Sequence, residues 1–287
     1  MFHIISNPVS GKKGNLRNPE LVSRVFERHG IEHTLYQTTY KGEGKELAER
    51  ITREGGRDIV VVGGDGTLHE VLNGLSDPSE CRLGLIPSGT GNDFACAAGL
   101  PMNAEQAAEL IVTGEAKDTD YIEVDGKRCM NVCGLGMDVD VLERCSRGKS
   151  RGKLKYLKSL LSSLFAFKGY KLRVETDEDT IEKDALIAAV CNGKVFGGGI
   201  KICPVAELDD HKFDVMIVDC LGGKLKLIKA FMVLMKGKIM DFPYLTHYRT
   251  DCVRFTTGDT DTVQLDGELY KGLNFVARIK QGLKFFR

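Results

Sequence analysis

Short apolar runs alternate with helix-forming segments over the first 115 residues of this 287-residue chain. The run from Ile59 to Val62 is β-branched and too short for a helix, so it predicts a strand buried on both faces of a sheet. The same alternation predicts strands at 2–6 and 32–37 and helices at 18–29, 43–54 and 103–113. Strands that alternate with helices in this way are typical of a parallel α/β domain.

From Asp120 onward the pattern changes to short runs of alternating apolar and polar residues, which predict antiparallel strands. Such strands are expected at 121–124, 171–175, 186–191, 213–218, 253–257 and 274–279, and helices at about 152–167 and 224–237. The predicted fold class is therefore α/β plus mainly β. An N-terminal parallel α/β domain covers 1–119, a sandwich-like antiparallel domain covers 120–273, and the terminal segment 274–287 belongs to either.

Three polar, glycine-containing turns follow strands of the first domain, at Asn7–Gly11, Gly63–Thr67 and Pro87–Asp93. In a parallel sheet all three lie at the carboxyl ends of the strands, where ligands of open α/β sheets bind. Glycine allows backbone amides to converge on anionic oxygens, and Asp65 faces the same space. Thr67 and Glu70 have capping-box spacing, so a helix that favours anions is expected to start there. The three turns together predict one nucleotide site.

The charge balance, the length of the apolar runs and the cysteine pattern exclude several classes of protein. Lys plus Arg equals Asp plus Glu at 40 each, so no overall charge indicates a nucleic-acid partner. No apolar stretch reaches the roughly 18 residues that a membrane-spanning helix needs. The nine Cys residues include no CxxC pair, and the N-terminus begins as a strand with no basic region before it. These features predict a protein of the reducing cytoplasm.

Two predicted helices combine apolar stripes with lysines. The first has Leu154, Leu157, Leu161 and Leu164, with Phe165 beside them and Lys153, Lys155 and Lys158 around them. The second has Leu225, Ile228, Phe231, Met232 and Met235 among Lys224, Lys226, Lys229, Lys236 and Lys238. Basic amphipathic helices lie on anionic membranes, but the same pattern suits a helix that packs on the core with solvated lysines outside. The sequence leaves both interpretations open.

Four motifs together carry a family resemblance. GGDGT is followed by HEVLNGL, NPVSG lies upstream, PSGTGNDFA lies downstream, and VQLDGELY occupies 263–270. This combination resembles the diacylglycerol kinase catalytic domain shared by soluble bacterial lipid kinases and sphingosine kinases. The resemblance implies an ATP-dependent, Mg²⁺-assisted lipid kinase, with diacylglycerol as the favoured substrate and phosphatidic acid as product. It also implies that the C-terminal segment returns to the ATP-binding domain.

The resemblance implies roles for individual residues. The predicted ATP contacts are Asn7, Pro8, Val9, Ser10, Gly11, Thr38, Gly63, Gly64, Asp65, Gly66, Thr67, Leu68, His69, Glu70, Gly89, Thr90, Asn92 and Asp93. Asp65 is expected closest to the metal and the transferred phosphate. The base is expected in the unit Asp266, Gly267 and Glu268, because two carboxylates that flank a glycine can address one hydroxyl. Which carboxylate takes the proton is open, and Asp-Gly is also a common hairpin turn.

A second acidic cluster resembles a structural metal loop of the soluble bacterial enzymes. By that resemblance Asp210 supplies a side chain, Glu207 and Lys212 supply carbonyls, and Asp120 links the ion to the active site through water. Carboxylates and carbonyls suit hard cations. His211 stands where the pattern has glycine, and an ordinary acidic turn is the alternative. His69 has no spaced His or Cys partner, which favours a helix-surface role over a metal-binding one.

Other functions stay open at this stage. A sphingoid base or another lipid alcohol could replace diacylglycerol as the acceptor. GGDGT is shared with NAD kinases, although an NAD kinase would not explain PSGTGNDFA, LDGE and the basic helices. A catalytically silent nucleotide- or lipid-binding regulator is a further alternative. We expect a lipid substrate at a membrane surface, peripheral membrane contact through the basic helices and no nucleic-acid partner. The oligomeric state is open, a homodimer included.

Overall fold

The computed structural model describes residues 1–11, 18–147, 162–163 and 169–287. The chain divides into two compact units, the first made of Met1–Asp120 with Gln281–Arg287 and the second of Tyr121–Lys280. The terminal segment is split between them, because β16 (Val276–Lys280) pairs with β6 (Tyr121–Val124) and β17 (Lys284–Phe286) pairs with β4 (Arg82–Pro87).

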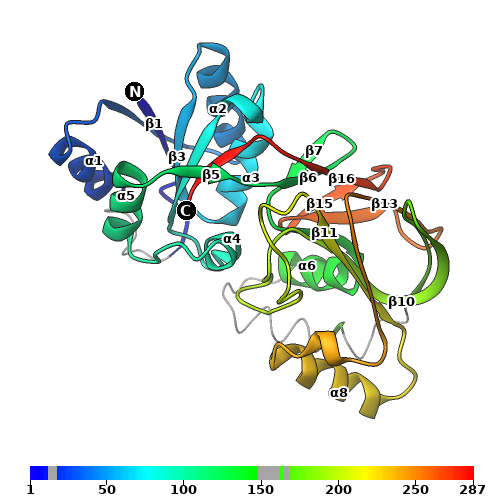
Figure 1. Ribbon diagram of the computed structural model, residues 1–287. Coiled ribbons are helices and arrows are strands. Elements are labelled where there is room, and N and C mark those ends of the chain that lie inside the picture. Colours follow the sequence, from blue (N-terminus) through cyan, green and yellow to red (C-terminus); the bar gives the residue numbers. More distant parts are fainter. Residues whose placement is uncertain (12–17, 148–161, 164–168) are drawn as a thin grey trace. The chain divides into compact units, whose positions relative to one another are not determined.

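The first unit is built on a sheet whose described strands run in the order β2-β1-β3-β4-β17-β5 (Figure 1). Neighbouring strands from β2 to β17 are parallel, and β5 is antiparallel to β17. The remaining bounds are β1 (Phe2–Ser6), β2 (His33–Gln37), β3 (Asp58–Gly63) and β5 (Ala116–Asp118). The central strands are almost entirely buried, as their continuous apolar runs predicted.

Helices cover this sheet on both faces (Figure 1). On one face, α1 (Asn18–Arg28) and α5 (Ala104–Thr113) enclose a core that includes Ile4, Val60 and Phe26. The other helices are α2 (Glu43–Arg53), α3 (Asp65–Gly74), α4 (Asp93–Ala97) and the short η2 (Pro78–Glu80). Helices α2 and α3 pack closely at Gly74, where a Cβ atom would lie 2.2 Å from the Lys45 carbonyl oxygen.

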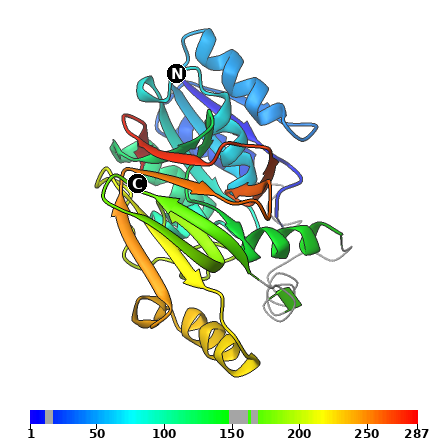
Figure 2. The same ribbon diagram turned by 90° about the vertical axis from the view of Figure 1, so that its right-hand side faces the viewer.

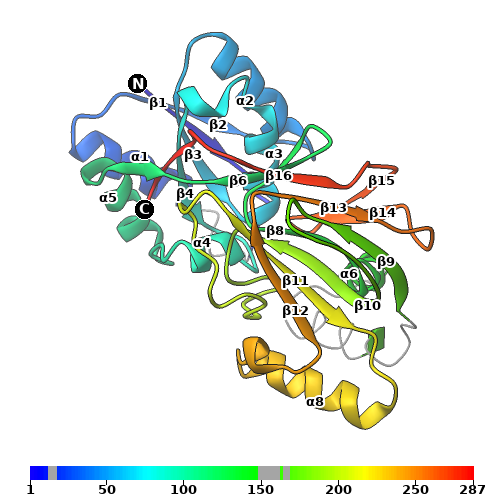
Figure 3. The same ribbon diagram turned by 45° about the vertical axis from the view of Figure 1, so that its right-hand side comes forward.

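The second unit contains one large antiparallel sheet, in which 11 strands are described (Figures 2 and 3). The long strand β10 (Thr180–Cys191) organises it. Its first half pairs with β9 (Tyr170–Glu175), and its second half pairs with β8 (Val132–Gly136) and β11 (Phe213–Asp219). The register shifts between Ala185 and Ile187. Such an irregularity bends a strand, which lets one sheet curl around its own core.

Two apolar clusters lie on the two faces of β10. Ala188 and Val190 belong to the cluster inside the curled sheet, whereas Ile187 and Ala189 belong to the cluster that α8 covers. The remaining elements are α6 (Met137–Arg147), α8 (Lys224–Met235), η3 (Ile239–Asp241), β7 (Lys127–Cys129), β12 (Leu245–Thr250), β13 (Cys252–Thr256), β14 (Thr262–Leu265) and β15 (Glu268–Lys271). The predicted fold class, parallel α/β plus a sandwich-like antiparallel β unit, is confirmed. The predicted helix at 152–167 falls almost wholly outside the described residues.

Candidate functional site

The carboxyl ends of four neighbouring parallel strands carry the predicted turns of the first unit. Asn7 follows β1, Thr38 follows β2, Gly64 follows β3 and Ser88 follows β4. Backbone hydrogen bonds join adjacent strand ends, from the Thr38 amide to the Ser6 carbonyl and from the Ser88 amide to the Gly63 carbonyl, each 2.8 Å. The structure therefore brings the predicted residues at 7–11, 38, 63–70 and 89–93 to one edge of the sheet.

The turn after β1 is held by Asn7. Its side-chain amide donates to Thr67 Oγ1 at 3.2 Å, and its Oδ1 accepts the Val9 amide at 3.1 Å. The Ser10 hydroxyl donates to the Asn7 carbonyl at 2.8 Å. Val9 is 81% exposed, so the turn that also contains Pro8 faces solvent. Asn7 thus ties this turn to the start of α3.

Two glycines let the turns after β3 and β4 touch. A Cβ atom at Gly89 would lie 2.5 Å from the Gly64 Cα atom, which no larger residue allows. Asn92 adopts a positive φ of 54°, and its Oδ1 accepts the Gly89 amide at 2.8 Å. Thr90 between them is exposed. The PSGTGND segment is therefore a compact turn against the GGDGT turn.

Helix α3 starts earlier than the capping-box prediction placed it. Its first residue is Asp65, and Gly64 is an N-cap without a side-chain hydrogen bond. The predicted capping role of Glu70 is wrong, because its two carboxylate oxygens accept the amides of Gly42 at 2.9 Å and Gly44 at 3.2 Å. Tertiary contact with the start of α2 satisfies this side chain instead.

The side chains that follow Gly66 on α3 point into the unit. Thr67, Leu68 and His69 are 4%, 1% and 3% exposed. The helix-surface role expected for His69 is therefore wrong. Its carbonyl accepts the Asn73 side-chain amide at 2.9 Å within the same helix. Asp65, by contrast, is only half-buried.

Asp65 and Asp93 flank one small space beside Gly91. A Cβ atom added to Gly91 would lie 3.0 Å from Asp65 Oδ2 and 3.4 Å from Asp93 Oδ2. Asp65 is oriented by the Phe94 amide, which donates to its Oδ1 at 3.1 Å. Proteins bind Mg²⁺ through one or two carboxylates together with substrate phosphates. This pair of carboxylates fits such an ion.

In the second unit, Asp266 and Gly267 form the two-residue turn between β14 and β15, with φ values of 51° and 86°. The Asp266 carboxylate accepts the Met130 amide at 2.8 Å, the Asn131 amide at 2.9 Å and the Cys129 thiol at 3.1 Å. The turn is thus fastened to the segment that precedes β8. Glu268, the first residue of β15, is half-buried.

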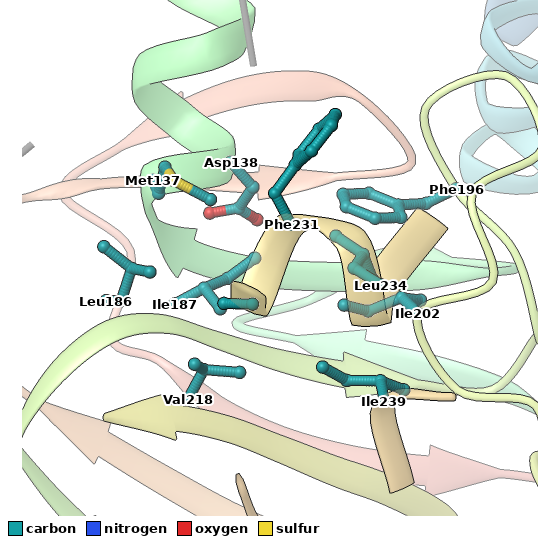
Figure 4. Close-up of a pocket in the computed structure, with 11 residues that line it drawn as sticks. Met137, Asp138, Leu186, Ile187, Phe196, Ile202, Val218, Phe231, Leu234 and Ile239 are labelled. Atoms are coloured by element: carbon teal, nitrogen blue, oxygen red, sulfur yellow. The ribbon is translucent and has the colours of Figure 1, made fainter. Parts of the chain in front are cut away.

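An apolar cavity in the second unit has one acid in its wall (Figure 4). It is lined by Met137, Asp138, Leu186, Ile187, Phe196, Ile202, Val218, Ala230, Phe231, Leu234 and Ile239. The cavity that these residues enclose is small, about 40 Å³. These residues come from α6, β10, β11, α8, η3 and the segment after β10. Ten of the eleven side chains are apolar, which suits a hydrocarbon ligand.

Asp138 and Gln264 are buried polar groups with unused hydrogen-bonding atoms. Among the described residues, neither Asp138 Oδ2 nor Gln264 Nε2 has a hydrogen-bond partner. The Gln264 amide favours the charged form of Asp138, yet no well-formed hydrogen bond joins them. Gln264 Oε1 accepts the Gly267 amide at 2.9 Å. One glutamine therefore links the acid of the cavity to the Asp266–Gly267 turn.

Burial raises the pKa of Asp138 from 3.8 to about 6, against smaller opposing effects of the hydrogen bond from the Val139 amide and of the nearby Gln264 amide group. Between these two values the folded state keeps the proton that the unfolded state has released. The free energy of unfolding therefore falls as pH rises from about 4 to about 6 and stays lower above that range.

Asp138→Asn is consequently expected to stabilise the protein at pH 7.5 by up to about 3 kcal/mol. Asparagine keeps the oxygen that accepts the Val139 amide but carries no charge. Chemical denaturation of both proteins at pH 7.5 and pH 4 measures the effect. The gain should disappear at pH 4, and an equal gain at both pH values would contradict the linkage.

The acidic loop at 207–214 has an arginine on its predicted metal-binding carboxylate. Asp210 forms an ion pair with Arg249, and its Oδ1 accepts the Lys212 amide at 3.1 Å. His211 adopts a positive φ of 62°. No cluster of three His, Cys, Asp or Glu side chains suited to a metal occurs in the part of the chain that the structure describes. The Arg249 guanidinium occupies the carboxylate expected to bind the cation with Glu207 and Asp120, so an ion pair takes the place of that cation in this structure.

Chelation tests that conclusion directly. We expect excess EDTA to leave the Tm unchanged, and Asp210→Asn to cost less than about 1 kcal/mol, since Arg249 is half exposed. Thermal unfolding with and without EDTA is the measurement. A Tm that falls on chelation in the native protein but not in Asp210→Asn would restore the cation site.

Sequence reasoning missed Asp138 and Gln264. Asp138 lies two residues after a strand that is buried throughout, in the first turn of α6. A charged residue at that place in an apolar run is an available signal. Gln264 has none, because its role depends on what β14 packs against.

Two family models match this chain. The diacylglycerol kinase catalytic domain matches residues 1–124, and the YegS C-terminal NAD kinase beta sandwich-like domain matches residues 131–282.

Relatives match over nearly the whole length. The diacylglycerol kinase of Bacillus subtilis (strain 168) is 29% identical over 275 residues, which cover 94% of this chain and 90% of that protein. The diacylglycerol kinase of Staphylococcus haemolyticus (strain JCSC1435) is 30% identical over 268 residues, 92% of this chain and 81% of that protein. A crystal structure of a diacylglycerol kinase from Bacillus anthracis str. Sterne superposes with a TM-score of 0.79 at 24% identity, over 99% of this chain and 96% of that one. That similarity supports the fold.

Proposed function

The chain belongs to the diacylglycerol kinase family and is a lipid kinase with ATP as phosphoryl donor, and on that premise we propose that it phosphorylates the hydroxyl of diacylglycerol to give phosphatidic acid. Kinases of this kind need phosphate positioning, charge neutralisation and a base for the acceptor hydroxyl. We assign the first two tasks to the first unit and the third to the second.

The observation that carries the choice of a lipid alcohol is the wall of the apolar cavity. An alcohol both donates and accepts a hydrogen bond. Asp138 Oδ2 can accept and Gln264 Nε2 can donate, and both atoms are buried without a partner among the described residues. A hydroxyl on an acyl-bearing substrate would satisfy both groups while its chains contact the apolar residues of the wall. Leaving such groups unsatisfied costs about 1–3 kcal/mol each, so their pairing favours binding.

For ATP, we assign phosphate contacts to the turns at Asn7–Gly11 and Gly63–Gly66 and to Gly89, Asn92 and Asp93. Thr38 and Thr90 are further proposed contacts. We assign a supporting role to the next three residues of α3. Leu68 and His69 are buried behind this edge of the sheet, and Glu70 accepts two backbone amides at the start of α2. Mg²⁺ would be held by Asp65 and Asp93 with the phosphates, and it would neutralise charge on the transferred group.

For the acceptor hydroxyl, we assign the base to the Asp266–Gly267–Glu268 unit. Gln264 supports this assignment, because it binds the Gly267 amide through one atom and faces Asp138 with the other. A hydroxyl held between Asp138 and Gln264 would therefore be oriented by the residue that also orients the turn.

A sphingoid base is the second candidate substrate, and the buried carboxylate of Asp138 is the feature that favours it. A buried carboxylate without a cationic partner would pair with an ammonium group. The relatives named diacylglycerol kinase favour the neutral substrate, whose hydroxyl would bind Asp138 without an ion pair.

Transfer of labelled γ-phosphate from ATP with Mg²⁺ separates these candidates. The acceptor panel is diacylglycerol in mixed micelles, a sphingoid base, phosphatidylglycerol, monoacylglycerol and NAD. Label in diacylglycerol above all others supports the proposal. Label mainly in the sphingoid base would make that lipid the substrate in place of diacylglycerol. Label in NAD alone would contradict a lipid acceptor. ATP binding without transfer to any lipid would support a catalytically silent regulator.

The proposed place of action is the cytoplasmic surface of a membrane, where the lipid substrate resides. No helix in the described ranges is long and apolar enough to span a membrane. We propose that the protein reaches this substrate by peripheral contact with the membrane. The first basic helix, with Lys153, Lys155 and Lys158, lies outside the described residues. The second basic helix is α8, which the structure describes.

A further inference from the structure

Helix α8 exposes an apolar face. Leu225, Ile228, Met232 and Met235 are 84%, 42%, 50% and 47% exposed. Their spacing along the helix places them on one side. Single exposed apolar residues are ordinary on protein surfaces, but a contiguous group of large ones marks an interaction site.

This face is separate from the one that packs on the unit. Leu227, Ala230, Phe231 and Leu234 contact the apolar cluster, and the last three also line the cavity. Phe231 therefore belongs to the inner face, although the sequence placed it in the same stripe as Met232. The helix lies beyond the ends of the paired strands β11 and β12 (Figure 3). Its outer face is not needed to build the core.

Charge identifies what this face would contact. Residues 220–240 contain five lysines and no Asp or Glu. Lys229 and Lys236 are exposed beside the apolar face, whereas Lys226, also exposed, has its Nζ atom 5.2 Å from the centre of the Tyr244 ring. A helix with this pattern suits a surface that is apolar in its depth and anionic at its edge, which is an anionic lipid bilayer.

We propose that the outer face of α8, formed by Leu225, Ile228, Met232 and Met235 with Lys229 and Lys236 beside it, docks on anionic membranes. This inference rests on the proposed function, since a lipid kinase must reach a substrate within a bilayer. Because the inner face of the same helix lines the cavity, docking would bring the cavity wall to the membrane surface.

Vesicle co-sedimentation of the full chain tests the docking face. The probes are vesicles of phosphatidylcholine with phosphatidylglycerol, and vesicles of phosphatidylcholine alone. Leu225→Gln with Met232→Gln is expected to weaken binding roughly tenfold or more. Lys229→Gln with Lys236→Gln should weaken binding to the anionic vesicles by a similar factor and reduce its salt dependence.

Matched controls come from the first unit. The exposed fraction of Met102 is 52%, similar to the 50% of Met232. Met102→Gln therefore removes about as much exposed apolar surface as Met232→Gln does, but in the first unit. Lys45 and Lys117 are exposed lysines, and their double replacement by Gln matches the charge change. Both controls are expected to bind as the native protein does. Equal losses in controls and α8 variants, or no loss in the α8 variants, would overturn the proposal.

Two further readouts separate this inference from its rivals. Turnover on a short-chain diacylglycerol dissolved as monomer should be unchanged in the α8 variants, while turnover on diacylglycerol in anionic vesicles should fall. If no lipid is phosphorylated, the proposed function fails although vesicle binding is still measured. If light scattering shows native self-association that the α8 variants lose, and vesicle binding is unaffected, the face joins two copies of this chain and membrane docking is wrong.

Discussion

Asp65→Asn is expected to lower kcat roughly 100- to 1,000-fold while the fold stays intact. Asparagine can keep the hydrogen bond that Asp65 Oδ1 accepts from the Phe94 amide, so the turn should hold its shape. What the variant loses is the negative charge that, with Asp93, would hold Mg²⁺ beside the transferred phosphate. The measurement is the initial rate of phosphate transfer across a range of Mg²⁺ concentrations.

The Mg²⁺ series makes the Asp65 result specific. A weakened metal site should raise the Mg²⁺ concentration needed for half-maximal rate, which a general loss of structure would not do. Asp77→Asn is the matched control, because Asp77 caps the short helix η2 and asparagine is an equally good cap. Native activity in Asp65→Asn would remove Asp65 from the chemistry.

Asp266→Asn and Glu268→Gln are both expected to lose turnover by about 100- to 10,000-fold, the usual contribution of general acid–base catalysis. Only Asp266→Asn should also lose stability. Its two carboxylate oxygens accept the Met130 and Asn131 amides, one each. Asparagine keeps only one of these oxygens, and its NH₂ group cannot accept a hydrogen bond, so one of the two amides is left without an acceptor. An unsatisfied buried amide costs about 1–3 kcal/mol. Measuring both the rate and the Tm of each variant separates the loss of a catalytic base from the loss of the hydrogen bonds that hold the turn.

Asp125→Asn provides the control for this pair. Asp125 and Gly126 form a second turn with positive φ values of 49° and 73°, between β6 and β7. The exchange there tests the effect of asparagine on such a turn without the Met130 and Asn131 contacts. If Asp266→Asn and Glu268→Gln both retain full turnover, the base lies elsewhere in the protein.

These two Asp-Gly turns show the limit of local sequence. Both dipeptides predict a two-residue hairpin turn, and both form one. Only the fold distinguishes them, since Asp266 accepts two backbone amides from the segment before β8. Asp125 instead accepts the Asn274 amide at 3.3 Å. The different roles come from partners more than 100 residues away along the chain.

Helix α8 and Glu70 show the same limit. The spacing of α8 predicted an amphipathic helix, but the helix is apolar on two sides, and periodicity could not say which side the core takes. Glu70 had capping-box spacing, yet the start of α2 lies close enough to bind its carboxylate. In both cases packing between elements overrides the local preference.

The sequence by itself determined the alternation of strands and helices in the first unit, the fold class and the glycine-rich edge of the parallel sheet. Those features follow from residue spacing and from where glycine is required, and both are local properties. Only the tertiary structure decided that Asp210 pairs with Arg249, that His69 is buried, and that Asp138 lines an apolar cavity. The reason is physical: burial and hydrogen-bond partners depend on which distant segments pack together, and a single sequence does not encode that in any local pattern.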